Sequence, residues 1–95
     1  MSRREYSASI IINGLFISRI VIDPHYEKKH AESINDDIIL GLVQMLNGSS
    51  FEPVEYKHPF VYFMDNILLN KKKFKLIWLM EIDKNYIGII NAYRS

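Results

Sequence analysis

The densest group of side chains able to do chemistry lies in one short segment, His25-Tyr26-Glu27-Lys28-Lys29-His30. Histidine can move protons near neutral pH, and lysine can hold the negative charge of a phosphate. Residues three and four apart are neighbours on a helix, so His25, Lys28 and Lys29 can share one side. A solvated helix face is the alternative interpretation of this charged run. Zinc is not expected, because His25 and His30 are five residues apart and no cysteine completes a site.

A second candidate is Arg94, which follows Asn91, Ala92 and Tyr93 at the end of an apolar stretch. Its guanidinium is a planar fork of donors that matches a phosphate and keeps its charge at ordinary pH. Arg94 is therefore a candidate for stabilising charge that develops in a transition state. The alternative is a surface arginine, or one that pairs with Glu81 across the sheet.

A third group combines cations with aromatic rings, and it contains Tyr62, Lys71, Lys72, Lys73, Lys75, Trp78 and Tyr86. Basic residues beside exposed rings can hold a single-stranded backbone and stack its bases. The alternative is again structural. Lysines in a hairpin turn keep a protein soluble, and a tryptophan is more often part of the core than a stacking platform.

The length and composition of the chain limit which kinds of protein it can be. The 95 residues suit one domain over 1–95, and 48% hydrophobic with 24% charged residues is typical of a globular chain. The 12 basic and 11 acidic residues leave a net charge of +1, so nucleic-acid binding requires a local patch. Without cysteine there is neither a disulfide nor a thiol nucleophile. No phosphate-binding or dinucleotide motif is present, so no cofactor is expected.

The first apolar stretch is interrupted by Asn13-Gly14 and Arg19, so neither a signal peptide nor a membrane span fits it. With the lack of cysteine, this predicts a cytoplasmic protein without a membrane partner. Secretion without a cleaved signal stays open for a bacterial effector. A homo-oligomer is compatible with the same sequence.

The elements that must position the candidate residues begin with a β-hairpin. Residues 7–12 and 15–22 are rich in β-branched and apolar types, and they flank Asn13-Gly14, which suits a tight turn. Neither face of the second arm is cleanly polar, which predicts a central strand. Asp23-Pro24 then ends this strand and begins a short helix over 24–31.

A longer helix follows and is predicted to hold the core together. Ser33 offers an N-cap, with Asp36 three residues later in an acidic version of the capping box. Asn47-Gly48 closes the helix. Gly41 weakens it unless close packing requires a glycine there. The apolar residues that recur at helical spacing are Ile34, Ile38, Ile39, Leu42, Val43 and Leu46.

The remaining sequence predicts a loop and then three strands. The loop covers 49–59, the strands cover 60–69, 74–82 and 86–94, and the lysine-rich turn 70–73 and the turn 83–85 join them. Both turns are short enough for antiparallel neighbours, so the strands form a meander. The predicted fold is α+β, with an N-terminal β-hairpin and one or two helices packed on a mostly antiparallel twisted sheet that ends in the meander.

This order of elements, ending in Ile89-Ile90-Asn91-Ala92-Tyr93-Arg94, resembles the RelE and BrnT superfamily of small ribonuclease toxins. The resemblance implies a bacterial toxin of a toxin-antitoxin or effector system, with RNA as substrate and a cognate antitoxin as partner. It also implies cleavage without metal by basic and histidine side chains. The family's arginine carries over to Arg94. The near-neutral charge and the added N-terminal hairpin depart from the family pattern.

The resemblance further implies a role for each candidate residue. The RNA 2′-hydroxyl is the nucleophile, His25 or His30 is the general acid or base, and Arg94 stabilises the pentacoordinate phosphate. The residues expected to contact RNA are Lys28, Lys29, Lys75 and Tyr93.

A competing hypothesis is a protein-binding module without catalytic activity, such as a phage or bacterial effector or regulatory protein. Six tyrosines and several apolar residues suit an interface at a sheet edge or an aromatic patch. A pocket that unites His25, Lys75 and Arg94 favours the enzyme. Those residues on separate faces, with an apolar patch elsewhere, favour the module.

Overall fold

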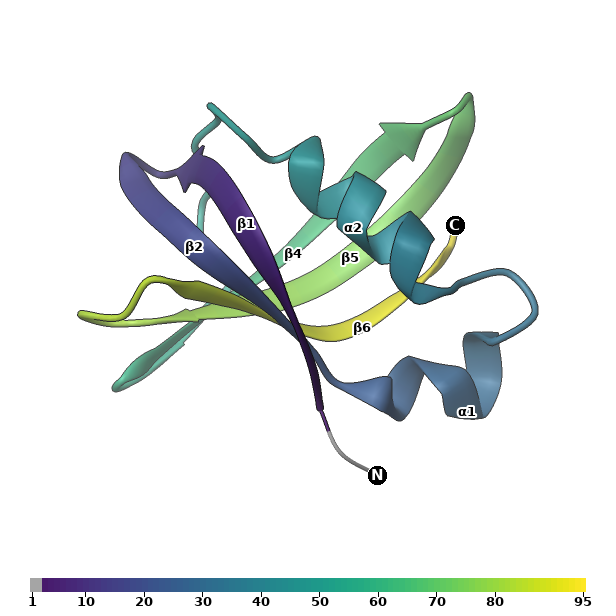
Figure 1. Ribbon diagram of the computed structural model, residues 1–95, viewed down its shortest axis with the longest axis horizontal. Helices are drawn as coiled ribbons and strands as arrows, with labels where there is room; N and C mark the ends of the chain where they lie inside the picture. Colours follow the sequence, from purple (N-terminus) through teal and green to yellow (C-terminus); the bar gives the residue numbers. More distant parts are fainter. Residues whose placement is uncertain (1–2) are drawn as a thin grey trace.

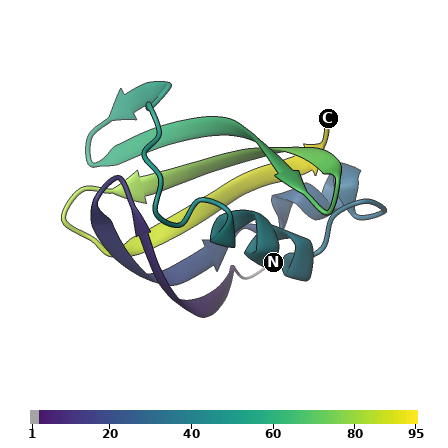
Figure 2. The ribbon, with the colours of Figure 1, turned by 90° about the horizontal axis from the view of Figure 1, so that it is seen from above.

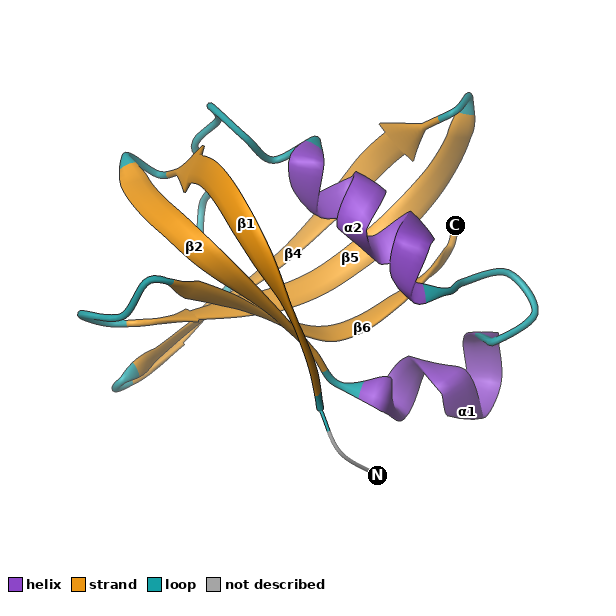
Figure 3. Cartoon of the chain, in the orientation of Figure 1, coloured by secondary structure: helices purple, strands orange, loops and turns teal. Residues whose placement is uncertain are grey.

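The computed structural model describes residues 3–95, which form one six-stranded sheet in the order β1-β2-β6-β5-β4-β3 (Figure 1). Four neighbouring pairs are antiparallel, and β2 and β6 are parallel. Figure 3 separates these strands from the few helical turns. The elements are β1 (Arg4–Ile12), β2 (Leu15–Ile22), η1 (Pro24–Tyr26), α1 (Glu27–His30), α2 (Asp36–Gln44), β3 (Glu55–Lys57), β4 (Phe60–Leu69), β5 (Lys72–Glu81) and β6 (Tyr86–Arg94).

The predicted N-terminal hairpin is confirmed. Asn13 and Gly14 have φ angles of 53° and 77°, the positive values that a two-residue hairpin turn needs. β2 is an interior strand, as expected, because it lies between β1 and β6. Its parallel pairing with β6 makes the sheet mixed. Three helical segments and three strands separate β2 from β6 in the chain, so no short turn imposes an antiparallel direction.

The helical region differs from the sequence prediction at one cap. The turns expected over 24–31 are present as η1 and α1, and Asp23 Oδ1 accepts a hydrogen bond from the backbone N of His25 at 2.9 Å. α2, however, begins after Asn35, whose Oδ1 accepts from the backbone N of Ile38 at 2.8 Å. The predicted Ser33 cap is wrong, because the backbone N of Ser33 still bonds to the carbonyl of His30 in the preceding turn.

α2 lies across one face of the sheet and fills the core there (Figures 1 and 2). Its predicted apolar stripe is confirmed, since Ile34, Ile39, Leu42, Val43 and Leu46 are all buried and Ile38 is partly buried. A Cβ at Gly41 would lie 3.1 Å from Cδ2 of Leu69, so this glycine permits close packing of α2 on β4.

Two connections in the C-terminal half also differ from the prediction. The expected loop over 49–59 contains the short strand β3, which pairs with the beginning of β4. The turn between β4 and β5 contains only Asn70 and Lys71, with φ angles of 51° and 66°. Lys72 and Lys73 therefore belong to β5, and the predicted three-stranded meander is confirmed with a tighter first turn.

The face of the sheet opposite α2 is called the open face below. Tyr62, Leu79, Gly88 and Val21 are successive register partners across β4, β5, β6 and β2, so they form one row on this face. Their neighbours along the strands, such as Phe63 and Trp78, point into the core. No helix in residues 3–95 has the length and the apolar sequence needed to cross a membrane.

We predict that Leu42→Ala lowers the free energy of unfolding by about 2 to 5 kcal/mol, because the Leu42 side chain is completely buried under α2. Thermal and denaturant melts measure this loss. Gln44→Ala is the matched control, since Gln44 is exposed on the same helix. Equal stability of the two variants would show that α2 does not anchor the core.

Candidate functional site

Three of the predicted site residues meet at one end of the open face. The rings of His30 and Tyr93 are stacked, with centroids 5.1 Å apart and planes inclined by 26°. Tyr93 on β6 is the register partner of Lys75 on β5, and directly opposed residues share a face. A candidate proton carrier, a phenol and a cation therefore come together from α1, β6 and β5.

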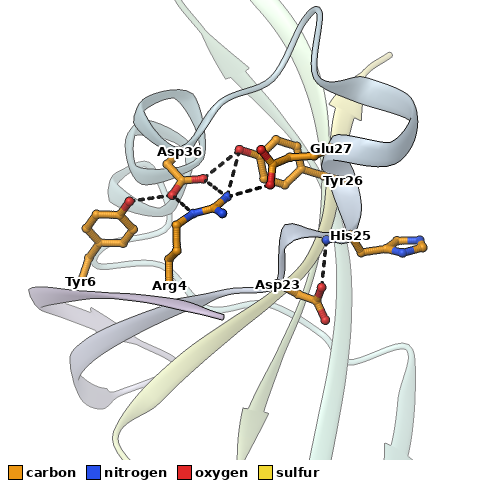
Figure 4. Close-up of polar contacts among 7 residues, drawn as sticks. All are labelled: Arg4, Tyr6, Asp23, His25, Tyr26, Glu27 and Asp36. Carbon is orange, nitrogen blue, oxygen red and sulfur yellow. Dashed lines mark hydrogen bonds and ion pairs between the residues drawn. The ribbon is translucent and has the colours of Figure 1, made fainter. Parts of the chain in front are cut away.

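The other predicted catalytic residues do not join this group directly. His25 is exposed, and Figure 4 shows its ring directed away from the polar contacts around Asp36. The guanidinium carbon of Arg94 lies 5.6 Å from the ring centroid of Phe74, a core residue that is also its register partner. Arg94 therefore occupies the opposite side of the strands from Lys75. The expected union of His25, Lys75 and Arg94 is not found.

Two alternatives raised by the sequence are decided by neighbouring contacts. Glu81 lies at the other end of β5 and accepts a hydrogen bond from the Tyr86 hydroxyl at 2.7 Å, so its pairing with Arg94 is wrong. Trp78 is fully buried and stacks on Phe63 at 4.0 Å, while its indole N–H donates to Asp65 at 3.2 Å. The tryptophan is therefore a core residue and not a stacking platform.

The exposed lysines Lys28 and Lys29 on α1 lie at the same end of the molecule as the turn between β4 and β5 and the end of β6 (Figures 1 and 2). This region is called the basic end. It carries seven of the 12 lysine and arginine residues, which are Lys28, Lys29, Lys71, Lys72, Lys73, Lys75 and Arg94. The positive charge of this near-neutral chain is thus gathered toward one end, with Lys75 and Arg94 on opposite sides of the strands.

The position of α1 depends on a cluster of side chains around Asp36, which Figure 4 shows. The Asp36 carboxylate accepts hydrogen bonds from Nε and a terminal nitrogen of Arg4 at 2.6 and 2.8 Å. It also accepts from the hydroxyls of Tyr6 at 2.6 Å and Tyr26 at 2.8 Å. Arg4 reaches Glu27 of α1 at 3.3 Å as well. This Asp36 cluster joins β1, η1, α1 and the beginning of α2.

The charges in the Asp36 cluster stabilise one another. The hydrogen bonds from Arg4 outweigh burial and lower the pKa of Asp36 to about 2. Burial, with the hydrogen bond to Asp36, raises the pKa of Tyr26 to about 12. The carboxylate raises the pKa of Arg4 further above its ordinary value. At neutral pH Asp36 is ionised and Tyr26 is protonated, so the cluster acts as a fixed structural tie and not as a proton carrier.

No sequence pattern predicts this cluster. Arg4 and Asp36 are 32 residues apart, and only the fold brings them together. The capping-box pattern predicts that the Asp36 side chain bonds to the backbone, but in the structure it binds Arg4 instead. Among residues 3–95, no group of three or more His, Asp or Glu side chains is arranged to hold a metal ion.

No family model, curated protein or solved structure matches the chain. The candidate site is therefore judged on the chemistry of its own residues.

We predict a pH-dependent contribution of Asp36 to stability. Its pKa is lower in the folded protein than the ordinary value of 3.8, so its contribution is complete above about pH 4 and is lost as the pH falls towards 2. Melting temperatures from pH 7 to pH 2 should converge for the parent and Asp36→Asn only in acid. Asp37→Asn is the control in the same helical turn, and it should follow the parent throughout. A constant gap between the parent and Asp36→Asn would contradict the prediction.

Proposed function

We propose that this protein is a metal-independent endoribonuclease of the bacterial cytoplasm, acting as a toxin of a toxin-antitoxin or effector system. The observation that carries the proposal is the stacked pair of His30 and Tyr93 beside Lys75. The order of elements on which the RelE and BrnT resemblance rests is also present, with strand, helical turns, capped helix and three-stranded meander in sequence.

In the proposed reaction, His30 removes the proton from the RNA 2′-hydroxyl. The bond from O2′ to phosphorus forms while the bond from phosphorus to O5′ breaks, and water returns a proton to O5′. The stack on Tyr93 restricts the His30 ring, so less orientational freedom is lost when substrate binds. Lys75, the register partner of Tyr93, contacts the phosphate.

The basic end holds the RNA backbone around this site. Lys28 and Lys29 extend the positive surface along α1, while the lysines of the β4–β5 turn extend it along the sheet. Binding to such a patch releases counterions from the RNA, which makes affinity fall as salt rises. A patch of this kind supplies local attraction that the net charge of +1 conceals.

Arg94 has a supporting role in this proposal. Its guanidinium must leave the ring of Phe74 and cross the edge of the strand before it reaches a phosphate beside Lys75. It directly follows Tyr93 and is exposed, so it can assist in binding RNA. The structure thus favours His30 over Arg94 as the residue on which the chemical step depends.

We predict that the purified protein cleaves single-stranded RNA in the presence of a chelator and that its induction arrests bacterial growth. His30→Ala should slow cleavage roughly 10²- to 10⁴-fold, the usual contribution of a general base. Arg94→Gln should cause a smaller loss than His30→Ala. Cleavage by gel assay and thermal melting are measured on the same preparations.

His25→Ala is the matched control, because His25 is a nearby exposed histidine without the Tyr93 contact. It should retain most of the parent activity. Undiminished cleavage by folded His30→Ala would exclude His30 from the reaction, and absence of cleavage by the parent would exclude the ribonuclease.

A second candidate function, the protein-binding module, is favoured by an apolar hollow at the end opposite the basic end. This hollow has a volume of about 360 Å³ and is partly lined by Leu15, Tyr56 and Ile82. These three side chains are 53%, 70% and 41% exposed, respectively. Exposed apolar groups around a hollow are typical of a protein interface. An antitoxin or another partner is a suitable occupant.

We predict that a partner recognised through this hollow does not bind the Leu15→Asp and Ile82→Asp variants. The Lys75→Gln variant should bind the partner as the parent does. The partner is purified with the tagged parent protein from its native operon and rebinding is measured by calorimetry. Loss of binding only in Lys75→Gln would place the partner at the basic end instead. RNA cleavage by the Asp variants is the accompanying control, since both substitutions are far from His30.

A further inference from the structure

A separate cavity lies on the open face, between β2 and β4, and has a volume of about 240 Å³. The row of Tyr62, Leu79, Gly88 and Val21 crosses it. Pockets for drug-sized ligands usually have volumes of about 300 to 1,000 Å³. This cavity therefore suits a single ring system and not a large ligand.

The walls of the cavity are aromatic. Phe60 and Tyr62 stand side by side with ring centroids 6.4 Å apart. Tyr86 is held in place from two directions, because its hydroxyl donates to Glu81 at 2.7 Å and the Arg19 guanidinium lies 5.5 Å from its ring centroid. Rings arranged in this way offer flat surfaces for stacking.

The floor of the cavity is formed where Leu79 of β5 packs over Gly88 of β6. A Cβ at Gly88 would lie only 2.9 Å from Cδ1 of Leu79, so the Leu79 side chain occupies the space above the glycine. The resulting surface is apolar and lies between the aromatic walls. It is suited to contact with the face of a planar group.

The rim provides polar groups of both kinds. Arg3 contributes a fork of donors, and Asp23 contributes a carboxylate. Oδ1 of Asp23 is bound to the backbone N of His25, so Oδ2 can accept from a ligand. A nucleobase has flat apolar faces and carries donors and acceptors at its edges. Its flanking phosphates also match the guanidinium group of Arg3.

We propose that this cavity binds one unpaired nucleobase of an RNA strand whose scissile phosphate lies beside His30. The proposal rests on the function proposed above and adds a subsite that selects single-stranded substrate. Ile90 lines the cavity, and Tyr93 follows three residues later, roughly 10 Å along the strand. One strand of RNA can therefore occupy both places.

The test uses a 2′-deoxy tetranucleotide, which lacks the nucleophile and so can bind without being cleaved. Titration followed by amide NMR shifts is expected to perturb Gly88 and Val21 in the parent protein. Tyr62→Ala should weaken binding roughly five- to a hundredfold, because the loss of one stacked base usually has this effect. Phe16→Ala is the matched control, since Phe16 is an exposed aromatic residue on β2 outside this cavity.

Perturbation of Gly88 and Val21 together with selective weakening by Tyr62→Ala supports the subsite. Shifts confined to the basic end, or equal affinities of the two variants, overturn it. The parent titration decides the location even if Tyr62→Ala fails to fold. If the tetranucleotide binds in the cavity but RNA is not cleaved, the ribonuclease proposal fails and the base-binding site stands. If RNA is cleaved without these shifts, only the subsite fails.

Discussion

The carboxylate of Asp36 is the point on which the arrangement around the site depends. The sheet ladders align the strands, but they do not determine where the short α1 lies, because a four-residue helix has little stability of its own. Four hydrogen bonds onto Asp36 from Arg4, Tyr6 and Tyr26 set that position, and the contact of Arg4 with Glu27 adds to them. His30 ends the same helix, so its stack on Tyr93 depends on the contacts that hold the beginning of α1 near Asp36.

Features governed by local sequence were the ones that could be predicted. Asn13-Gly14 specified its turn through backbone conformation, and the spacing of Leu42 and its apolar neighbours specified the buried face of α2. Predictions from neighbouring residues were wrong where side chains far apart in the sequence bind one another in the fold. Ser33 and Asp36 do not form a capping box, because the backbone N of Ser33 bonds to the His30 carbonyl and Asn35 caps α2, while Arg4 and two tyrosines bind the Asp36 oxygens. The parallel pairing of β2 with β6 has no local signal at all.

The candidate site shows the same division. Residue chemistry offered His30, Lys75 and Tyr93 among several other candidates. The register of β5 with β6 and the position of α1 bring these three together. In the same register Arg94 is paired with the core residue Phe74, so its side chain lies on the opposite face from Tyr93. Alternation along the strand predicts this only when the pairing of β5 with β6 is known. The uneven distribution of charge could not be predicted from the net charge of +1, because that total sums the basic end and the rest of the chain. The aromatic cavity on the open face combines four strands and has no linear motif.

The parallel contact between β2 and β6 has a consequence for the order of folding. The residues that it brings together are far apart in the chain, as in the contact of Ser18 with Asn85 across 67 residues. The N-terminal hairpin can form as soon as it is synthesised, but β2 gains its second neighbour only after β6 has emerged from the ribosome. Such non-local pairing slows folding and leaves a strand edge exposed in the meantime. Because Tyr93 lies in β6 itself, the nascent chain cannot assemble the His30 stack before this step.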